Sequence, residues 1–192
     1  MELMTKEFFE QPTLTLAEEL LGCELIKETE AGITSGYIVE TEAYIGAIDP
    51  AAHSFDYKRT KRTEIMFKEP GLAYTYVMHT HCLVNVVTGE PGEPEAILIR
   101  AIEPVQGIDL MYDRRGDKKE KDLTNGPGKL TKAMGIDKAD YGHPFGESPL
   151  YIAKGFTPEN ISTGPRVGIE NSGEARHFPW RFWVTGNKFV SR

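Results

Sequence analysis

Short apolar segments separated by turn signals are the feature that most restricts how this chain can fold. Residues 23–26 and 36–44 flank the turn signal Glu30-Ala31-Gly32, and residues 72–87 and 96–102 continue the pattern. Segments of this kind, bounded by glycine or proline, are typical of strands. The longest uninterrupted apolar runs are far shorter than the roughly 20 residues that a membrane-spanning helix needs. The pattern therefore predicts a mixed sheet and no contact with a membrane.

Three short helices are expected around this sheet. Residues 15–21 carry apolar side chains at helical spacing, and Gly22 is placed to end that helix. Pro104 is expected to end the strand before it and to begin a helix over residues 105–114, since proline is tolerated in a first helical turn. Residues 127–134 are the third candidate.

The length and composition of the chain favour one domain that spans residues 1–192. A chain of 192 residues, 40% of them hydrophobic, is long enough to bury a core. Two cysteines, Cys23 and Cys82, and the lack of a charged and then apolar leader argue against a secreted disulfide scaffold. We therefore expect a reducing compartment: the cytoplasm, with nucleoid association in a bacterium, or the nucleus in a eukaryote.

The charge of the chain is unusual for a nucleic-acid-binding protein, but its cations are clustered. The net charge is −7, whereas DNA-binding proteins draw much of their affinity from lysine and arginine. One basic cluster consists of Lys58, Arg59, Lys61 and Arg62, and a second lies within residues 114–119. Both suit contacts with phosphate. A solvated run of charge is the alternative interpretation of each.

A glycine-rich segment precedes the third predicted helix. Residues 125–130 read Asn-Gly-Pro-Gly-Lys-Leu, and this spacing is not that of a nucleotide-binding P-loop. Exposed backbone N–H groups at Gly126 and Gly128, with the cation of Lys129, could hold a phosphate at the positive end of the helix dipole. Ordinary turn chemistry explains the same residues.

A row of polar side chains in the strand over residues 36–44 is the first candidate for chemistry. Alternation along a strand puts Glu40, Glu42 and Tyr44 on one face and Val39, Thr41 and Ala43 on the other. Arg100 interrupts an apolar strand, where a buried guanidinium is costly unless it meets a carboxylate. Glu42 is a candidate partner for Arg100. A solvent-facing strand and a purely structural ion pair are the alternatives.

Two further groups of residues admit more than one interpretation. Tyr74 and Tyr76 share a strand face, and an aromatic row more often fills a core than stacks on a base. His79, His81 and Cys82 are competent metal ligands, but no second closely spaced pair completes a tetrahedral set. A metal-dependent hydrolase that uses these histidines with a glutamate therefore stays an alternative, and we expect no metal.

Seven motifs in a fixed order cover nearly the whole chain, from about residue 8 to residue 191. They are Glu40-Thr-Glu-Ala-Tyr-Ile-Gly46, Ala51-Ala-His-Ser54, Lys68-Glu-Pro-Gly71, Tyr74-Thr-Tyr76, Leu98-Ile-Arg-Ala-Ile-Glu-Pro104, Asn125-Gly-Pro-Gly-Lys-Leu130 and Arg166-Val-Gly168. In order and spacing they resemble the alkyladenine (3-methyladenine) DNA glycosylase family of mammals and bacteria. The resemblance implies an α+β domain with a curved, largely antiparallel sheet and a protruding β-hairpin that enters the DNA minor groove.

The same resemblance implies a reaction and a partner. The partner is double-stranded DNA that contains damaged purines of the 3-methyladenine, hypoxanthine and ethenoadenine class, from which a monomeric enzyme without a cofactor excises the flipped base and leaves an abasic site. By position, Glu42 activates a water, which Arg100 and the backbone carbonyl of Val167 help to place. A non-catalytic lesion-binding module, which would dispense with Glu42, is the competing class.

Base recognition is also assigned by the resemblance. Tyr44, Tyr76 and His53 match residues that contact the flipped purine, and Asn85 matches a residue that crowds the 2-amino group of guanine. His79 aligns with the intercalating aromatic residue of the hairpin. This hairpin is one residue shorter than the mammalian version, so a neighbour of His79 is an alternative wedge.

Overall fold

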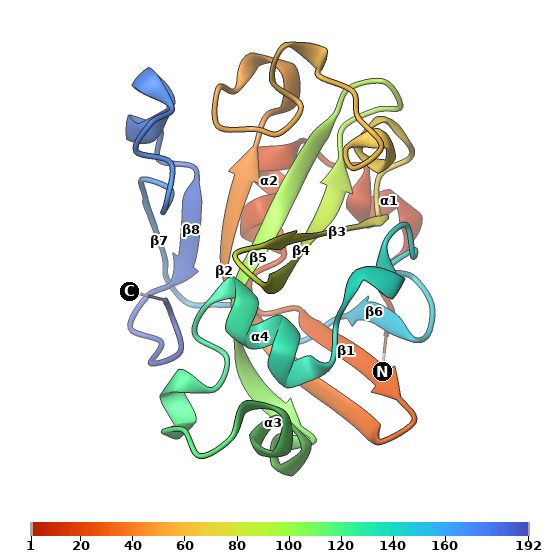
Figure 1. The fold of residues 1–192 in the computed structure, drawn as a ribbon. Helices are drawn as coiled ribbons and strands as arrows, with labels where there is room; N and C mark the ends of the chain where they lie inside the picture. Colours follow the sequence, from red (N-terminus) through yellow and green to blue (C-terminus); the bar gives the residue numbers. More distant parts are fainter. Residues whose placement is uncertain (1, 192) are drawn as a thin grey trace.

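A curved, antiparallel sheet forms the framework of the computed structural model, which describes residues 2–191 (Figure 1). Eight strands of these residues join it in the order β3-β4-β5-β2-β1-β6, and β8 pairs with β2 and with β7. The strands are β1 (Glu24–Thr29), β2 (Gly32–Tyr44), β3 (Ala73–Met78), β4 (His81–Thr88), β5 (Glu95–Gln106), β6 (Leu150–Ala153), β7 (Ile161–Gly164) and β8 (Arg181–Val184). All their pairings are antiparallel, which confirms the fold implied by the resemblance and corrects the mixed sheet.

Short helices surround the sheet. The α-helices are α1 (Lys6–Phe9), α2 (Thr13–Glu19), α3 (Ile108–Arg115) and α4 (Pro127–Met134). The 3-10 turns are η1 (Gly46–Ile48), η2 (Phe55–Tyr57), η3 (Glu64–Phe67), η4 (Glu120–Asp122), η5 (Lys138–Asp140) and η6 (Gly173–His177). Helix α2 lies behind the sheet, and α4 lies in front of it beside the β3–β4 hairpin (Figure 1). None of these helices combines the length and apolar character needed to cross a membrane.

The main core fills the space between the sheet and α2. Leu16 of α2 and Leu20, the residue that follows this helix, are fully buried with Ile97, Ile99 and Ile102 of β5. Burial of apolar side chains of this size stabilises a fold by roughly 1.5–3 kcal/mol each. The functional residues predicted on β2 and β5 lie outside this core, where Val39 and Ala101 also pack with Phe189 in a separate apolar cluster.

Proline at position 104 does not have the role that the sequence suggested. Strand β5 continues through Pro104 to Gln106, and α3 begins only at Ile108. Pro104 lies opposite Gly36, directly beside a bulge at which Val105 of β5 is the extra residue. A strand tolerates proline at such a bulge because the ladder hydrogen bond is already interrupted. Gly107, with a φ of 70°, then makes the turn into the helix.

Two further bulges interrupt the pairing of β2 with β5. Val39 of β2 and Arg100 of β5 each fall between directly paired residues. The predicted alternation of side chains put Val39 on the face of Thr41 and Ala43. Ala43 does belong to the main core, but Val39 packs against Phe189 in a separate cluster. This expectation was wrong because an extra residue in a strand reverses the facing of its side chains.

Candidate active site

The bulges bring three charged side chains of β2 and β5 together. Glu40 and Glu42 follow the bulge on β2, and Arg100 is the extra residue on β5. Both glutamates are fully buried, and 7% of Arg100 is exposed. Nη1 of Arg100 lies 3.4 Å from Oε1 of Glu42, and its Nε donates to Oε1 of Glu40 at 2.9 Å. Arg100 therefore contacts Glu42, its predicted partner, but lies closer to Glu40.

Glu42 is held from several sides. The backbone N–H of Val167 donates to Oε1 at 2.7 Å, and the hydroxyl of Tyr44 donates to Oε2 at 2.8 Å. Burial raises the pKa of Glu42 above its ordinary value, although Arg100, the Val167 N–H and the Tyr44 hydroxyl each oppose that rise. The carboxylate is therefore ionised less readily than an exposed glutamate, as suits a residue that exchanges protons.

A cavity of about 160 Å³ opens beside this carboxylate. Its walls include Tyr44, His53, Tyr76, Asn85, Arg100 and Val167, all of which the sequence singled out. Three of them contact Glu42, which itself lies behind the wall. A larger cavity of about 920 Å³ lies elsewhere. We favour the smaller one as the site because five glutamates line the larger one, and a carboxylate wall repels phosphate.

Aromatic rings make up one wall of the smaller cavity. The ring centroids of His53 and Tyr76 lie 4.7 Å apart, and Nδ1 of His53 lies 2.9 Å from the hydroxyl of Tyr74. Burial, reinforced by Arg62 and Lys58, lowers the pKa of His53 to about 4. His53 is therefore neutral near pH 7. Burial also raises the pKa of Tyr76 to about 12, so that its phenol is neutral as well.

Asn85 of β4 is a buried residue of the same cavity wall. Only 3% of it is exposed, and its Nδ2 donates to the backbone carbonyl of Tyr74 at 2.9 Å. This bond fixes the orientation of the amide. Asn85 also pairs with Leu98 of β5, another residue of the cavity wall. The side chain is therefore a fixed part of the cavity wall.

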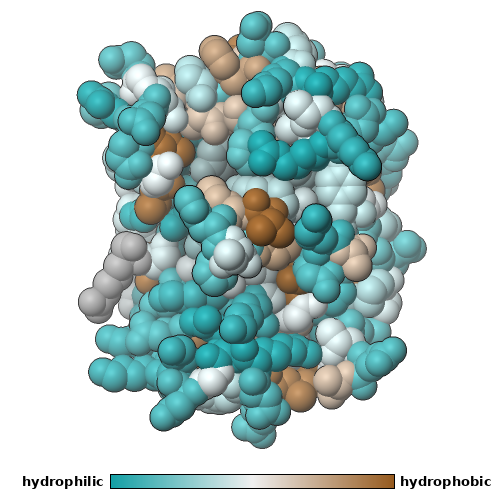
Figure 2. Space-filling view, viewed as in Figure 1, coloured by the Kyte–Doolittle hydropathy of each residue, from teal (hydrophilic) through white to brown (hydrophobic). Residues whose placement is uncertain are grey.

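The β3–β4 hairpin borders the cavity through Met78, next to its tip. His79 and Thr80 form a two-residue turn with φ angles of 49° and 78°, as in the tight turns that suit strand twist. Met78 is 46% exposed and lines the cavity, whereas His79 is not part of its lining. The face viewed in Figure 2 is mostly hydrophilic, with a hydrophobic spot near its centre, over the hairpin.

Helix α4 supports the hairpin through close packing. A Cβ atom on Gly128 would lie 2.7 Å from Cβ of His81, so only glycine permits this approach. Thr131 donates to the carbonyl of Cys82 at 2.6 Å. Nζ of Lys129 donates to the side chain of Asn125. The glycine-rich segment therefore has a packing role at Gly128, while Gly126 caps the helix as expected of a turn.

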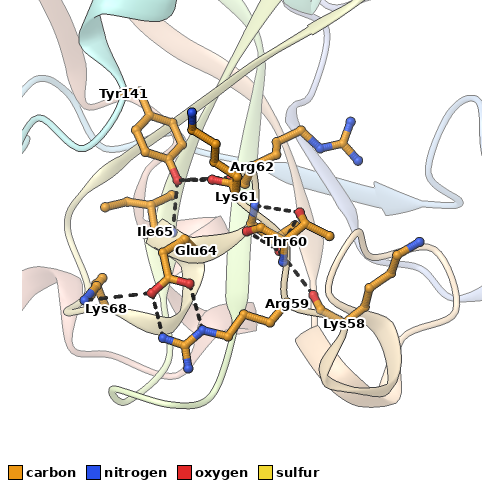
Figure 3. A network of polar contacts seen from close by, with 10 residues as sticks. Lys58, Arg59, Thr60, Lys61, Arg62, Glu64, Ile65, Lys68 and Tyr141 are labelled. Carbon is orange, nitrogen blue, oxygen red and sulfur yellow. Dashed lines mark hydrogen bonds and ion pairs between the residues drawn. The ribbon is translucent and has the colours of Figure 1, made fainter.

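The first basic cluster lies on a loop that is held in place by side-chain hydrogen bonds (Figure 3). Arg59 makes two hydrogen bonds to Glu64, at 2.8 and 2.6 Å. The backbone carbonyls of Lys61 and Arg62 accept hydrogen bonds from the hydroxyl of Tyr141. Among residues 2–191, Lys58, Lys61 and Arg62 form no ion pair. These three cations are therefore available to an anionic partner, and Arg59 is already engaged.

The suspected metal ligands on the hairpin do not assemble into a site. Within the described part of the chain, no three histidine, cysteine, aspartate or glutamate side chains gather around a common point. Burial also raises the pKa of the Cys82 thiol to about 11, which disfavours the thiolate that a metal needs. The metal-dependent alternative thus lacks a ligand set among these residues.

The sequence did not reveal two polar groups that support the site. Arg166 is fully buried with Asp49 and lies over the ring of Tyr44, 4.7 Å from its centroid. Ser191 donates from both its N–H and its hydroxyl to Glu40. Arg166 belongs to one of the seven motifs, but nothing in the pattern indicates its partner. No sequence signal pointed to Ser191.

Comparisons with known proteins agree on one family. A family model described as methylpurine-DNA glycosylase matches residues 7–188. A protein from Bacillus licheniformis is 62% identical over 191 residues, which cover 100% of this chain and 97% of the relative. One from Bacillus subtilis (strain 168) is 64% identical over 185 residues, or 96% and 94% of the two chains. One from Listeria monocytogenes serotype 4b is 50% identical over 191 residues, or 98% and 92%. All three carry the provisional name 3-methyladenine DNA glycosylase.

Proposed function

The chain belongs to the methylpurine-DNA glycosylase family, and from that premise we propose that it excises damaged purines from duplex DNA with a water that Glu42 activates. One observation carries this proposal. A fully buried carboxylate, paired with a buried arginine, lies directly behind an aromatic-walled cavity. A non-catalytic lesion-binding module would have no need of such a costly buried charge.

The chemistry of this arrangement follows from the charge that develops on the sugar. As the bond between C1′ and the purine nitrogen breaks, its electron pair departs with the purine, and the sugar acquires oxocarbenium character, which a nearby carboxylate stabilises. The oxygen of a water then bonds to C1′, and its proton passes to Glu42. Oε2 of Glu42 accepts one hydrogen bond, from Tyr44, and keeps a second acceptor position. Arg100 and the Val167 segment hold the carboxylate, and the Val167 carbonyl is proposed to help place the water.

Selection of the base is assigned to the cavity wall. Tyr44, Tyr76 and His53 are proposed to contact the flipped purine, and the neutral rings suit stacking on an electron-poor damaged base. Asn85 is proposed to crowd the 2-amino group of guanine, because its amide is fixed by the Tyr74 carbonyl. The proposed substrates are 3-methyladenine, hypoxanthine and ethenoadenine. The product is an abasic site, and no strand cleavage is expected.

The DNA-facing surface combines the hairpin with nearby cations. The tip of the hairpin is proposed to fill the space left by the flipped nucleotide, through His79 or its exposed neighbour Met78. Lys58, Lys61 and Arg62 are proposed to contact phosphates, together with the start of α4. We propose a monomer, and a cytoplasmic location stays a prediction.

Release of free base is the direct test. Duplex oligonucleotides that contain hypoxanthine or ethenoadenine, and methylated DNA, are incubated with the protein in the presence of a chelator. We expect free base and an intact, alkali-labile strand. Lesion binding without release would favour the non-catalytic module, and release that stops in chelator and returns with zinc would favour the metal-dependent hydrolase.

The salt dependence of DNA binding should separate the free cations from the engaged one. Lys61→Ala is expected to weaken binding to undamaged duplex and to reduce the slope of log K against log salt by about 1, the value for one phosphate contact. Arg59→Ala is the matched control, since its charge is paired with Glu64, and it should change the slope less. Fluorescence anisotropy between low and physiological salt measures both. Equal slopes in the two variants would contradict the assignment.

A further inference from the structure

Glu40 is a second buried carboxylate beside the proposed catalytic one, and the reaction does not use it. It has no exposed surface. Ser191 donates to it from the backbone N–H at 2.6 Å and from the hydroxyl at 2.8 Å. Nη1 of Arg181 lies 3.5 Å from its Oε1. Glu40 is not part of the cavity wall, so it has no direct access to a bound base.

Glu40 and Ser191 together hold one side of the Arg100 guanidinium. Nε of Arg100 donates to Glu40 at 2.9 Å, and its Nη2 donates to the hydroxyl of Ser191 at 3.1 Å. Only Nη1 faces Glu42, at 3.4 Å. An unrestrained arginine prefers a bidentate pair with a carboxylate at about 2.7–2.9 Å. The pair of Arg100 with Glu42 is therefore longer than it would be without this competition.

We propose that Glu40 and Ser191 are positioning residues, which hold Arg100 at a distance from Glu42 and so leave that carboxylate free to accept a proton from water. This inference rests on the proposed function. A glutamate clamped by both ends of a guanidinium is a weaker base, because the ion pair stabilises its charged form. Glu40 takes up the stronger contact with Arg100 instead.

The groups around Glu42 determine in which direction its pKa should change when Glu40 is replaced. The charged groups are Glu40 on β2, Arg100 on β5 and Arg181 on β8, and the neutral polar groups are the phenols of Tyr44 and Tyr76 and the Val167 N–H. Burial is the largest cause of the raised pKa of Glu42, and the negative charge of Glu40 adds to it. Replacing Glu40 by glutamine removes that charge and lets Arg100 approach. Both changes lower the pKa of Glu42.

The test compares the pH dependence of base excision in wild type and Glu40→Gln. We expect kcat at pH 7.5 to fall by roughly 3- to 30-fold, since a weaker base transfers the proton less effectively. The acid limb of the profile should move down by about one pH unit, and KM should change little. Ser191→Ala keeps every charge, and it should lower kcat and the pH of the acid limb by smaller amounts than Glu40→Gln does. It also carries the test if Glu40→Gln does not fold.

Asp140→Asn is the matched control. Asp140 is a buried carboxylate that is paired with Lys27 and is absent from the cavity wall. Its loss should leave the acid limb in place. A fall in kcat for Glu40→Gln with an unmoved or raised acid limb would overturn the proposal, because a general loss of structure does not lower the pKa of one carboxyl.

A second measurement separates this inference from the proposed function. Carbon NMR of the side-chain carboxyl carbon of Glu42 follows its titration without any substrate. A lower pKa in Glu40→Gln supports the positioning role even if no base is released, in which case only the proposed function fails. An unchanged or raised pKa overturns the positioning role, whatever the activity of the wild type.

Discussion

Glu42→Gln is expected to reduce base excision by on the order of 10²–10⁴-fold, the usual contribution of a general base. Glutamine has the same shape and still accepts the hydrogen bond from the Val167 N–H, but it cannot take a proton from water. Binding to DNA that contains a lesion should therefore change by only a few-fold. The measurements are the single-turnover rate of base release and the dissociation constant from fluorescence anisotropy.

The control for this result is again Asp140→Asn, which also removes a buried carboxylate charge. It should leave the single-turnover rate close to that of wild type. Unchanged excision by Glu42→Gln would remove Glu42 from the mechanism. Equal losses of excision and of lesion binding would show that the carboxylate serves structure rather than chemistry.

Local patterns in the sequence predicted the strands well but not their irregularities. The alternation over residues 36–44 correctly turned Glu42 and Tyr44 away from Ala43, which lies in the main core. Val39 departs from it, because a bulge inserts one residue and leaves no mark on the composition of a strand. Pro104 misled for a similar reason, since a bulge made room for it within β5.

In the candidate site, too, some contacts could be predicted from local sequence and others could not. The pairing of Arg100 with a carboxylate could be predicted, because a guanidinium in an apolar strand demands a partner. That Glu40 holds the closer contact depends on the two bulges and was not predictable. Arg166 with Asp49 and Ser191 with Glu40 are separated by 117 and 151 residues, and no local pattern links partners so distant.

The buried pair of Arg166 with Asp49 links the segments that surround the cavity. Arg166 also donates to the backbone carbonyl of Ala43, next to Tyr44 at the end of β2. Asp49 accepts from the N–H groups of Ile45 and Ala51, and so fixes the loop that leads to His53. Both side chains of the pair are fully buried. Two carboxylate oxygens and two guanidinium nitrogens face each other, which is the strong, bidentate form of such a pair.

Arg166→Met is therefore expected to lower the free energy of unfolding by about 3–5 kcal/mol, because it leaves the charge of Asp49 buried without a partner. Chemical denaturation followed by circular dichroism measures this loss. The double variant Arg166→Met with Asp49→Asn removes both charges, and should be more stable than Arg166→Met alone by on the order of 1–3 kcal/mol. If the double variant is no more stable than Arg166→Met alone, the contribution of Arg166 comes from packing over Tyr44 and Trp180 rather than from charge. Recovery of stability in the double variant would instead show that the loss in Arg166→Met comes from the unpaired charge of Asp49. The ion pair itself then holds together the segments that carry Tyr44, His53 and Val167.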